Sequence, residues 1–245
     1  MWYDRCTAID LTYKSKICLW EIFMINVAID GPAGAGKSYL ARTVAARLGY
    51  IYVDTGALYR AIGLYMTRRG IAVSDSPSVI QALTDVSVAL DYASDGQQHV
   101  YLNNEDVSTD IRMPEISMAA STVSAIPEVR AFLLDIQRNM ARTHNVVMDG
   151  RDIGTVILPD AQVKIFLCAN EKARAKRRFL ELTEKGVKTT LEEVEAEMMT
   201  RDRNDSTRKV APAVAAEDAV ILDNSDLDRE GTVEAALAII REKLA

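Results

Sequence analysis

The sequence predicts an α/β protein in which helices cover both faces of a parallel sheet and a second lobe is inserted. Three observations lead to this. Short apolar runs alternate with helical patterns along most of the 245 residues, and a glycine-rich loop follows the first run. One internal region instead alternates apolar and polar residues. The first two features are typical of a doubly wound sheet with its ligand at the carboxyl ends of the strands. The third indicates a small antiparallel sheet.

Composition is that of an ordinary globular protein, with 49% hydrophobic and 26% charged residues and a net charge of −6. The acidic balance argues against non-specific binding to nucleic acid. No apolar stretch approaches the roughly 18–20 residues of a membrane span. The three cysteines lack metal-ligand spacing, and with only two histidines zinc chemistry is disfavoured. We therefore expect a reducing, cytoplasmic environment.

Residues 1–23 stand apart from this pattern. Charged residues interrupt every apolar stretch in the segment, so it does not resemble a secretory signal. It is either an accessory segment or a disordered extension that arises from a start codon placed too early. We favour the second interpretation because Met24 directly precedes the first strand. The domain proper is then expected to span 24–245.

The first expected strand, Ile25–Ile29, is followed by Gly31-Pro-Ala-Gly-Ala-Gly-Lys37-Ser38 and by a helical pattern from about Ser38. This is G-x-x-x-x-G-K-[ST] in the strand–loop–helix context of a phosphate-binding loop. Backbone N–H groups and the helix N-terminus would surround a phosphate, Lys37 would reach the outer phosphates, and Ser38 would ligate Mg²⁺. A chance match has a probability of roughly one in a hundred. The loop therefore predicts binding of a nucleoside triphosphate by Gly31, Pro32, Ala33, Gly34, Ala35, Gly36, Lys37, Ser38 and Tyr39.

The second expected strand, Ile51–Val53, leads into Asp54-Thr-Gly-Ala-Leu-Tyr-Arg60. A hydroxyl at the exit of the strand and an arginine about one helical turn later predict an anion site that faces the phosphate loop. From Val86 to about Val107 the alternating pattern, with turn signals at 94–96 and 103–104, indicates the antiparallel sheet. Helical patterns follow at about 114–125 and 127–143. We expect 83–143 to be a substrate-binding insertion, the alternative being a decorative one.

The remaining expected strands are Val146–Met148, Val163–Cys168 and Ala219–Leu222. Helices are expected at Glu171–Glu184, Leu191–Thr200 and Thr232–Leu244, the last one amphipathic. The stretch 201–216 is first charged and then contains Ala and Pro. The core of the domain would thus comprise 24–82 and 144–245.

Asp-[Ser/Thr]-Gly-x-x-Tyr-Arg after a phosphate-binding loop resembles the nucleoside-monophosphate kinases, and specifically the bacterial cytidylate kinases. The most specific match is Gly150-Arg-Asp-Ile-Gly-Thr155, and the likeness runs from about Ile25 to the C-terminus. It implies an adenylate-kinase-like three-layer α/β/α sandwich with an enlarged monophosphate-binding insertion and a short lid at about 186–212. It also implies ATP-dependent, Mg²⁺-assisted phosphorylation of CMP and dCMP by a monomeric enzyme.

The residue types suit that chemistry. The attacking phosphate oxygen is already ionised, so catalysis depends on positioning and charge neutralisation rather than on a strong base. An arginine-rich site is expected, and the family motifs single out Arg60, Arg151, Arg201 and Arg208. Lys37, Arg151, Arg201 and Arg208 are the expected catalytic residues. For Arg174 and Arg178 a solvated helix face is an equally good explanation.

The resemblance also implies how the acceptor is bound. Cytosine offers one amino donor and two acceptors, which suit a carboxylate and an arginine. Asp152, Arg130 and Ser121 would hold the base. Thr55, Arg60 and Arg151 would hold the phosphate, and Arg201, Asp205 and Arg208 of the lid would reach the sugar and phosphate.

The chain departs from the family pattern in two places. Asn204 and Ser206 stand where many relatives carry lid arginines, and Tyr39 replaces the usual Thr after Ser38. The role of Asp149 is open, because it could organise magnesium or only orient the loop that follows it.

Other functions fit less well. Thymidylate and uridylate kinases lack both the long antiparallel insertion and the Gly-Arg-Asp-x-Gly-Thr signature. A GTPase-like switch would carry an Asn/Thr-Lys-x-Asp tetrapeptide, which does not occur here. The acidic balance and the absence of an aromatic and basic groove disfavour a nucleic-acid kinase or binder.

Overall fold

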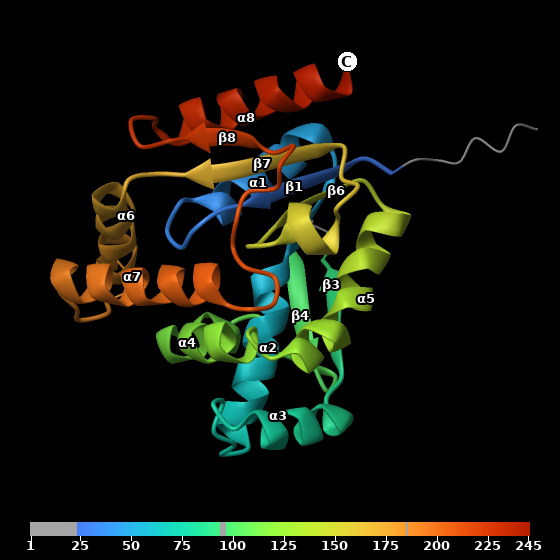
Figure 1. Ribbon diagram of the computed structural model, residues 1–245, viewed down its shortest axis with the longest axis vertical. Helices are drawn as coiled ribbons and strands as arrows, with labels where there is room; N and C mark the ends of the chain where they lie inside the picture. Colours follow the sequence, from blue (N-terminus) through green and yellow to red (C-terminus); the bar gives the residue numbers. More distant parts are fainter. Residues whose placement is uncertain (1–23, 94–96, 185) are drawn as a thin grey trace, which may run out of the picture.

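The computed structural model describes residues 24–93, 97–184 and 186–245, so the N-terminal extension and the expected turn at 94–96 lie outside the described residues. Five parallel strands form a sheet in the order β2-β6-β1-β7-β8 (Figure 1). Their bounds are β1 Asn26–Asp30, β2 Ile51–Asp54, β6 Val146–Asp149, β7 Val163–Cys168 and β8 Val220–Asp223. All five expected strands are confirmed within one residue, because each is an apolar run; the helical layers bury most of these residues, whereas the edge strand β8 is partly exposed.

Helices cover both faces of the sheet. On one face, α1 (Lys37–Leu48) and α8 (Arg229–Leu244) pack on alternate residues of β1 and β7, which include Val27, Ile29 and Ile165. On the other face, α5 (Pro127–Thr143) and a single π-helical turn (Ile153–Ile157) cover Ala28, Val53 and Met148. These layers confirm the expected three-layer sandwich.

The chain between β2 and β6 forms a second lobe below the sheet (Figure 1). It comprises α2 (Thr55–Arg68), α3 (Ser76–Ala82), β3 (Val88–Tyr92), β4 (Gln98–Leu102), β5 (Glu105–Asp106), α4 (Pro114–Val123), α5 and short 3₁₀ turns at Leu83–Asp85 and Asp110–Arg112. The expected antiparallel sheet is confirmed, with order β3-β4-β5. Asn103 and Asn104 both have positive φ, as a two-residue hairpin turn requires. The lobe has its own apolar cluster, which begins in α2, before the expected start of the insertion at residue 83. The division of the chain into core and insertion at residue 83 stays a prediction.

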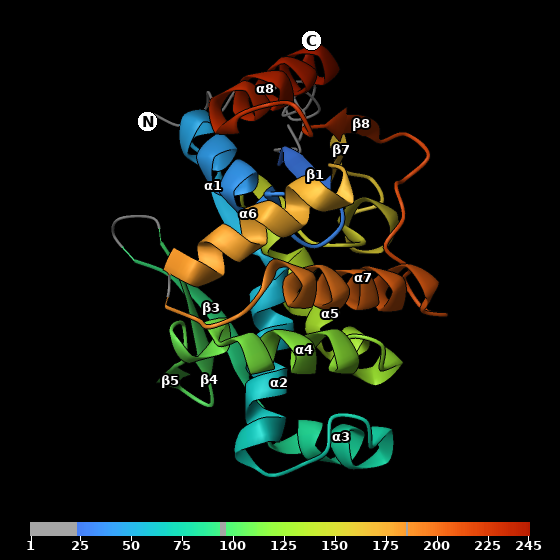
Figure 2. The same ribbon diagram turned by 90° about the vertical axis from the view of Figure 1, so that its left-hand side faces the viewer.

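Two further helices, α6 (Glu171–Glu184) and α7 (Leu191–Thr207), lie beside the ends of the strands (Figure 2). The bounds of α6 are as expected, but the expected end of α7 at Thr200 is wrong, because the helix continues to Thr207. Thr190 and Glu193 form a reciprocal capping box at its start. The last helix begins at Arg229 rather than Thr232, because Asp228 caps it there. None of the helices in the described ranges is both long and apolar enough to span a bilayer.

Candidate active site

The phosphate loop leaves β1 at Gly31 and enters α1 at Lys37, in the expected strand–loop–helix order. Gly31 has φ 146°, and a Cβ there would lie 2.0 Å from the Leu167 carbonyl oxygen, so this close approach requires glycine. The Lys37 ammonium group folds over the loop and donates to the Pro32 carbonyl at 2.7 Å. Tyr39 lies further along α1, with the Arg229 guanidinium 5.1 Å from the centre of its ring.

Residues from other elements hold the loop in place. Asp202 of α7 accepts a hydrogen bond from the Ala33 N–H at 2.9 Å, and Arg174 of α6 donates to the Ala33 carbonyl at 2.8 Å. Arg174 and Asp202 also form an ion pair with each other. On the other side, the Asn224 amide donates to the Ala35 carbonyl at 3.1 Å. Arg174 is therefore no solvated surface charge, and the sequence analysis gave neither Asp202 nor Asn224 a role.

A carboxylate lies beside the hydroxyl of Ser38. The Ser38 hydroxyl donates to one oxygen of Asp149 at 2.8 Å, and the Tyr52 hydroxyl donates to the other at 3.1 Å. Burial, with a contribution from the charge of Asp54, raises the pKa of Asp149 to about 6. A carboxylate that is costly to ionise in this setting, next to a loop hydroxyl, favours a bound cation. No cluster of three or more potential metal-binding side chains occurs in the part of the chain described.

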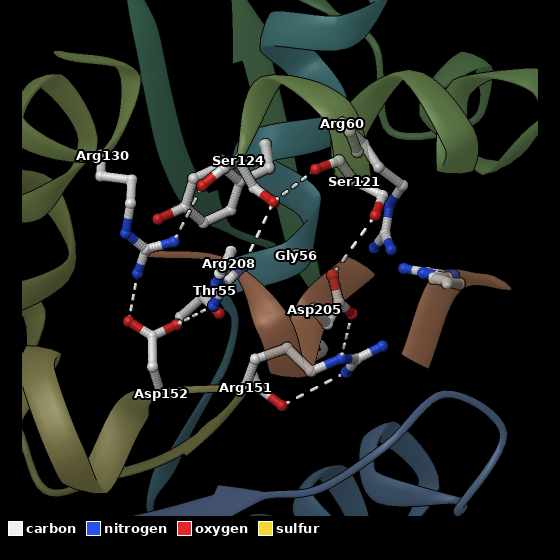
Figure 3. A pocket seen from close by; sticks show the side chains of 14 residues that line it. Thr55, Gly56, Arg60, Ser121, Ser124, Arg130, Arg151, Asp152, Asp205 and Arg208 are labelled. Atoms are coloured by element: carbon white, nitrogen blue, oxygen red, sulfur yellow. Dashed lines mark hydrogen bonds and ion pairs between the residues drawn. The ribbon is translucent and has the colours of Figure 1, made fainter. Parts of the chain in front are cut away.

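A pocket of about 480 Å³ opens at the carboxyl ends of the strands (Figure 3). Its lining comes from the start of α2, from α4 and α5, from the loop after β6, and from α7 and the residue that follows it. All nine residues expected to bind the acceptor line it, namely Thr55, Arg60, Ser121, Arg130, Arg151, Asp152, Arg201, Asp205 and Arg208.

At one end of the pocket, Asp152 lies between two arginines (Figure 3). One of its oxygens accepts from Arg130, and the other accepts from Arg208 at 3.2 Å. Arg130 also donates to the Ser124 carbonyl at 3.2 Å, and its guanidinium lies 5.5 Å from the centre of the Tyr59 ring. Burial raises the pKa of Asp152 although both arginines oppose the shift. This end thus presents a buried carboxylate next to a fixed guanidinium.

In the middle of the pocket, Asp205 links α7 to the loop after β6 and to α4. It accepts from the Nε atom of Arg151 at 2.9 Å and from the Ser121 hydroxyl at 3.3 Å (Figure 3). Burial opposes ionisation, but Arg151 and Arg201 outweigh it and hold the pKa of Asp205 below its usual value. Asp205 therefore stays ionised at neutral pH.

Positive charge gathers where the pocket meets the phosphate loop. Burial and the neighbouring Arg151 lower the pKa of Arg201 to about 10, and its buried Nε has no hydrogen-bond partner among the described residues. Burial, Arg151 and Arg201 also lower the pKa of Lys37 well below its usual range. Arg60 lies nearby and pairs with Asp54 at 2.7 Å. This arrangement suits a bound anion with several negative charges.

Sequence reasoning missed several residues that line the pocket or support it. Tyr59 stands within the Asp54–Arg60 motif, so its neighbours were a usable signal. Ser124, which accepts from Arg208 at 3.3 Å through its hydroxyl, follows the end of α4 and carries no local signal. The pocket brings the nine expected residues together, and their individual roles in binding stay predictions.

Comparison with known proteins agrees with this geometry. The family model described as cytidylate kinase matches residues 27–242. A cytidylate kinase from Caldicellulosiruptor bescii is 48% identical over 217 residues, which cover 88% of this chain and 95% of that protein. One from Lactobacillus johnsonii is 46% identical, with coverage of 90% and 96%. Among solved structures, shikimate kinase from Bacteroides thetaiotaomicron aligns with a TM-score of 0.44 and 13% identity over 90% of this chain and 98% of that one.

Proposed function

This chain belongs to the cytidylate kinase family, and from that premise we propose how its residues carry out the reaction. Members of the family transfer phosphate from ATP to CMP and give CDP, and this chain is such a kinase. One observation supports the roles that we propose for individual residues. The nine residues expected to bind CMP come from distant parts of the sequence and line one pocket beside the phosphate loop.

The end of the pocket that contains Asp152 binds the base of CMP. The Asp152 carboxylate accepts from the amino group of cytosine, while Arg130 and Ser121 donate to the carbonyl oxygen and ring nitrogen. Uracil has no amino group, so it would leave Asp152 buried without that partner. Deoxycytidine carries the same base, and dCMP is therefore a second acceptor.

The opposite end holds the reacting phosphates. Thr55, Arg60 and Arg151 bind the phosphate of CMP, and Lys37 binds the outer phosphates of ATP. Arg151 and Arg201 lie close enough to Lys37 to lower its pKa, so their charges reach the place where the transferred group passes. Fixed cations there stabilise the charge on the equatorial oxygens without a general base. Arg208 supports the transfer from the base end, where it is paired with Asp152.

Mg²⁺ fits the Ser38–Asp149 pair. Kinases hold this ion with one or two protein oxygens plus substrate phosphates, and the Ser38 hydroxyl and Asp149 carboxylate lie 2.8 Å apart. When bound, Mg²⁺ supplies a counter-charge for the β- and γ-phosphates. Asp149 thus takes the first of its two possible roles, that of organising the metal.

We also propose that the enzyme acts in the cytoplasm as a monomer on free nucleotides and does not act on nucleic acid. The net charge of −6 supports the last point, because a nucleic-acid binder needs a basic surface. The nine residues proposed to bind the acceptor come from one chain, which supports the monomer.

Steady-state assays with CMP, dCMP, UMP, AMP and dTMP test the proposal. We expect turnover of CMP and dCMP, and a loss of roughly ten- to a hundredfold in kcat/KM for CMP in Asp152→Asn, with the KM for ATP unchanged. Asp160→Asn, at an exposed position in the following loop, is the matched control. Equal losses for CMP and ATP would indicate collapse of the site, and indifference to CMP would refute the function itself.

A further inference from the structure

Asp30 is the last residue of β1, immediately before the phosphate loop, and its side chain binds the 153–157 turn. It is only 4% exposed. One carboxylate oxygen accepts from the Ile153 N–H and the other from the Gly154 N–H, each at 2.8 Å. These two N–H groups open the π-helical turn that follows Asp152. Asp30 therefore caps that turn from a neighbouring strand.

Asp152 is the residue that would ordinarily supply this cap. It stands at the N-cap position of the turn Ile153–Ile157, and aspartate at such a position usually accepts from the N–H of the second or third helical residue, here Gly154 or Thr155. Here its side chain makes no capping hydrogen bond. Both of its oxygens instead face the pocket, where Arg130 and Arg208 bind them. Asp30 thus caps the 153–157 turn, and the Asp152 carboxylate is free to face the pocket.

We propose that Asp30 is a positioning residue for acceptor specificity: it satisfies the N-terminus of the 153–157 turn and so keeps the Asp152 carboxylate available to the base. This inference rests on the proposed role of Asp152 in reading cytosine. Asp30 adjoins Gly31 of the phosphate loop and also binds the residues directly after Asp152. Strand β1 therefore fixes the position of the loop that contains Asp152 relative to the phosphate loop.

Without the Asp30 carboxylate, the freed N–H group of Gly154 would draw the Asp152 side chain back to its own turn. The carboxylate would then leave Arg130 and Arg208 and no longer present its oxygens to the acceptor. Such a change affects recognition of the base more than binding of the donor phosphates, on which Asp30 acts only through its charge near Lys37. A merely structural role for Asp30 predicts a different result, namely lower stability with unchanged specificity.

The test compares selectivity between CMP and UMP in Asp30→Asn, Asp30→Ser and Asp152→Asn. We expect Asp30→Asn to raise the KM for CMP by roughly ten- to a hundredfold, with the ratio of kcat/KM for CMP over UMP falling toward that of Asp152→Asn and the KM for ATP unchanged. Asparagine keeps one acceptor oxygen and turns an amide donor toward the second N–H, whereas serine has one shorter hydroxyl and no such repulsion. Asp30→Ser should therefore show a loss of the same kind, and it covers the case in which the Asn variant does not fold. Asp75→Asn, which weakens the exposed cap of α3, is the matched control.

A folded Asp30→Asn or Asp30→Ser variant that melts earlier but keeps the full preference for CMP would overturn the inference. Equal losses for CMP and ATP would overturn it as well, because they would indicate general damage to the site. The result for Asp152→Asn separates the two claims. If that variant keeps the preference for CMP, the proposed reading of cytosine fails; if it loses the preference while Asp30→Asn keeps it, only the role of Asp30 fails.

Discussion

The Arg201 guanidinium lies in a part of the pocket where positive charge exceeds negative charge. Arg60, Arg151 and Arg208 each pair with a carboxylate. The Nε atom of Arg201 is buried and finds no hydrogen-bond partner within residues 24–93, 97–184 and 186–245. Burial lowers the pKa of Arg201 most, and Arg151 and Arg60 add to this. A cation held in this way is destabilising until an anion arrives, so the residue is suited to binding phosphate at the expense of the stability of the free enzyme.

Replacing Arg201 should therefore change stability and activity in opposite directions. In Arg201→Met we expect the free energy of unfolding of the ligand-free protein to rise by about 1 kcal/mol, because an unsatisfied buried polar group is lost. The KM for CMP should rise and kcat should fall. Urea denaturation without ligands and steady-state kinetics measure the two effects, with the exposed Arg203→Met as control. A loss of stability in Arg201→Met would mean that its charge is already compensated in the free enzyme.

The titration of Asp30 gives a prediction for pH. Burial raises its pKa from 3.8 to about 6, so between about pH 4 and pH 6 the folded protein binds more protons here than the unfolded chain. The contribution of Asp30 to the free energy of unfolding therefore falls as the pH rises through that window.

The comparison with Asp30→Asn isolates this contribution, because Asp149, whose pKa is raised in the same direction, is present in both proteins. The difference in unfolding free energy, wild type minus variant, should decrease by up to about 3 kcal/mol between pH 4 and pH 6 and then level off. Denaturation in urea at a series of pH values measures it. A difference that increases with pH would show that the carboxylate is stabilised in its ionised form.

At the level of elements, helix α7 shows what the sequence could and could not predict. The five strands were predicted within one residue because an apolar run between turn residues is a local signal. The end of α7 was wrong because residues 201–207 are polar and lack helical apolar spacing. In the structure they remain helical while Asp202 binds the phosphate loop and Asp205 binds Arg151. Such contacts come from segments far away in the sequence and leave no local pattern.

The same distinction applies to the site. The phosphate loop and the anion site at Thr55 and Arg60 follow from residue chemistry and spacing, whereas the other residues that bind the acceptor were identified through resemblance to a family. Neither source pointed to Asp30 or Ser124, whose positions depend on the packing of β1 against the 153–157 turn and on where α4 ends. The division of capping and recognition between Asp30 and Asp152 becomes visible only when the two strands are placed side by side.

At the scale of the whole molecule, three parts meet at the pocket, and each has apolar packing of its own. The sheet with α1 and α8, the insertion, and the α6–α7 pair contain separate clusters. Figure 2 shows α7 lying between α4 and the sheet. The bonds that join these parts across the pocket are polar, through Asp205 to Arg151 and Ser121 and through Arg208 to Ser124. A movement of the α6–α7 pair would therefore expose little apolar surface, whereas α5 keeps the insertion packed on the sheet. This suits a lid formed by α7 that admits substrate and closes.

Closure over both nucleotides should determine how fast the enzyme transfers the γ-phosphate of ATP to water instead of to CMP. With CMP absent, water is not held in line with the γ-phosphate, so we expect ATP hydrolysis to be slower than transfer to CMP by at least about a hundredfold. Cytidine, which lacks the phosphate that Arg60 and Arg151 hold, should not stimulate ATP hydrolysis. In Asp205→Asn the charged link between α7 and Arg151 is lost, so the ratio of hydrolysis to transfer should rise. Release of inorganic phosphate and formation of CDP, measured in parallel, give that ratio. A wild-type hydrolysis rate close to the transfer rate would show that closure by α7 does not exclude water.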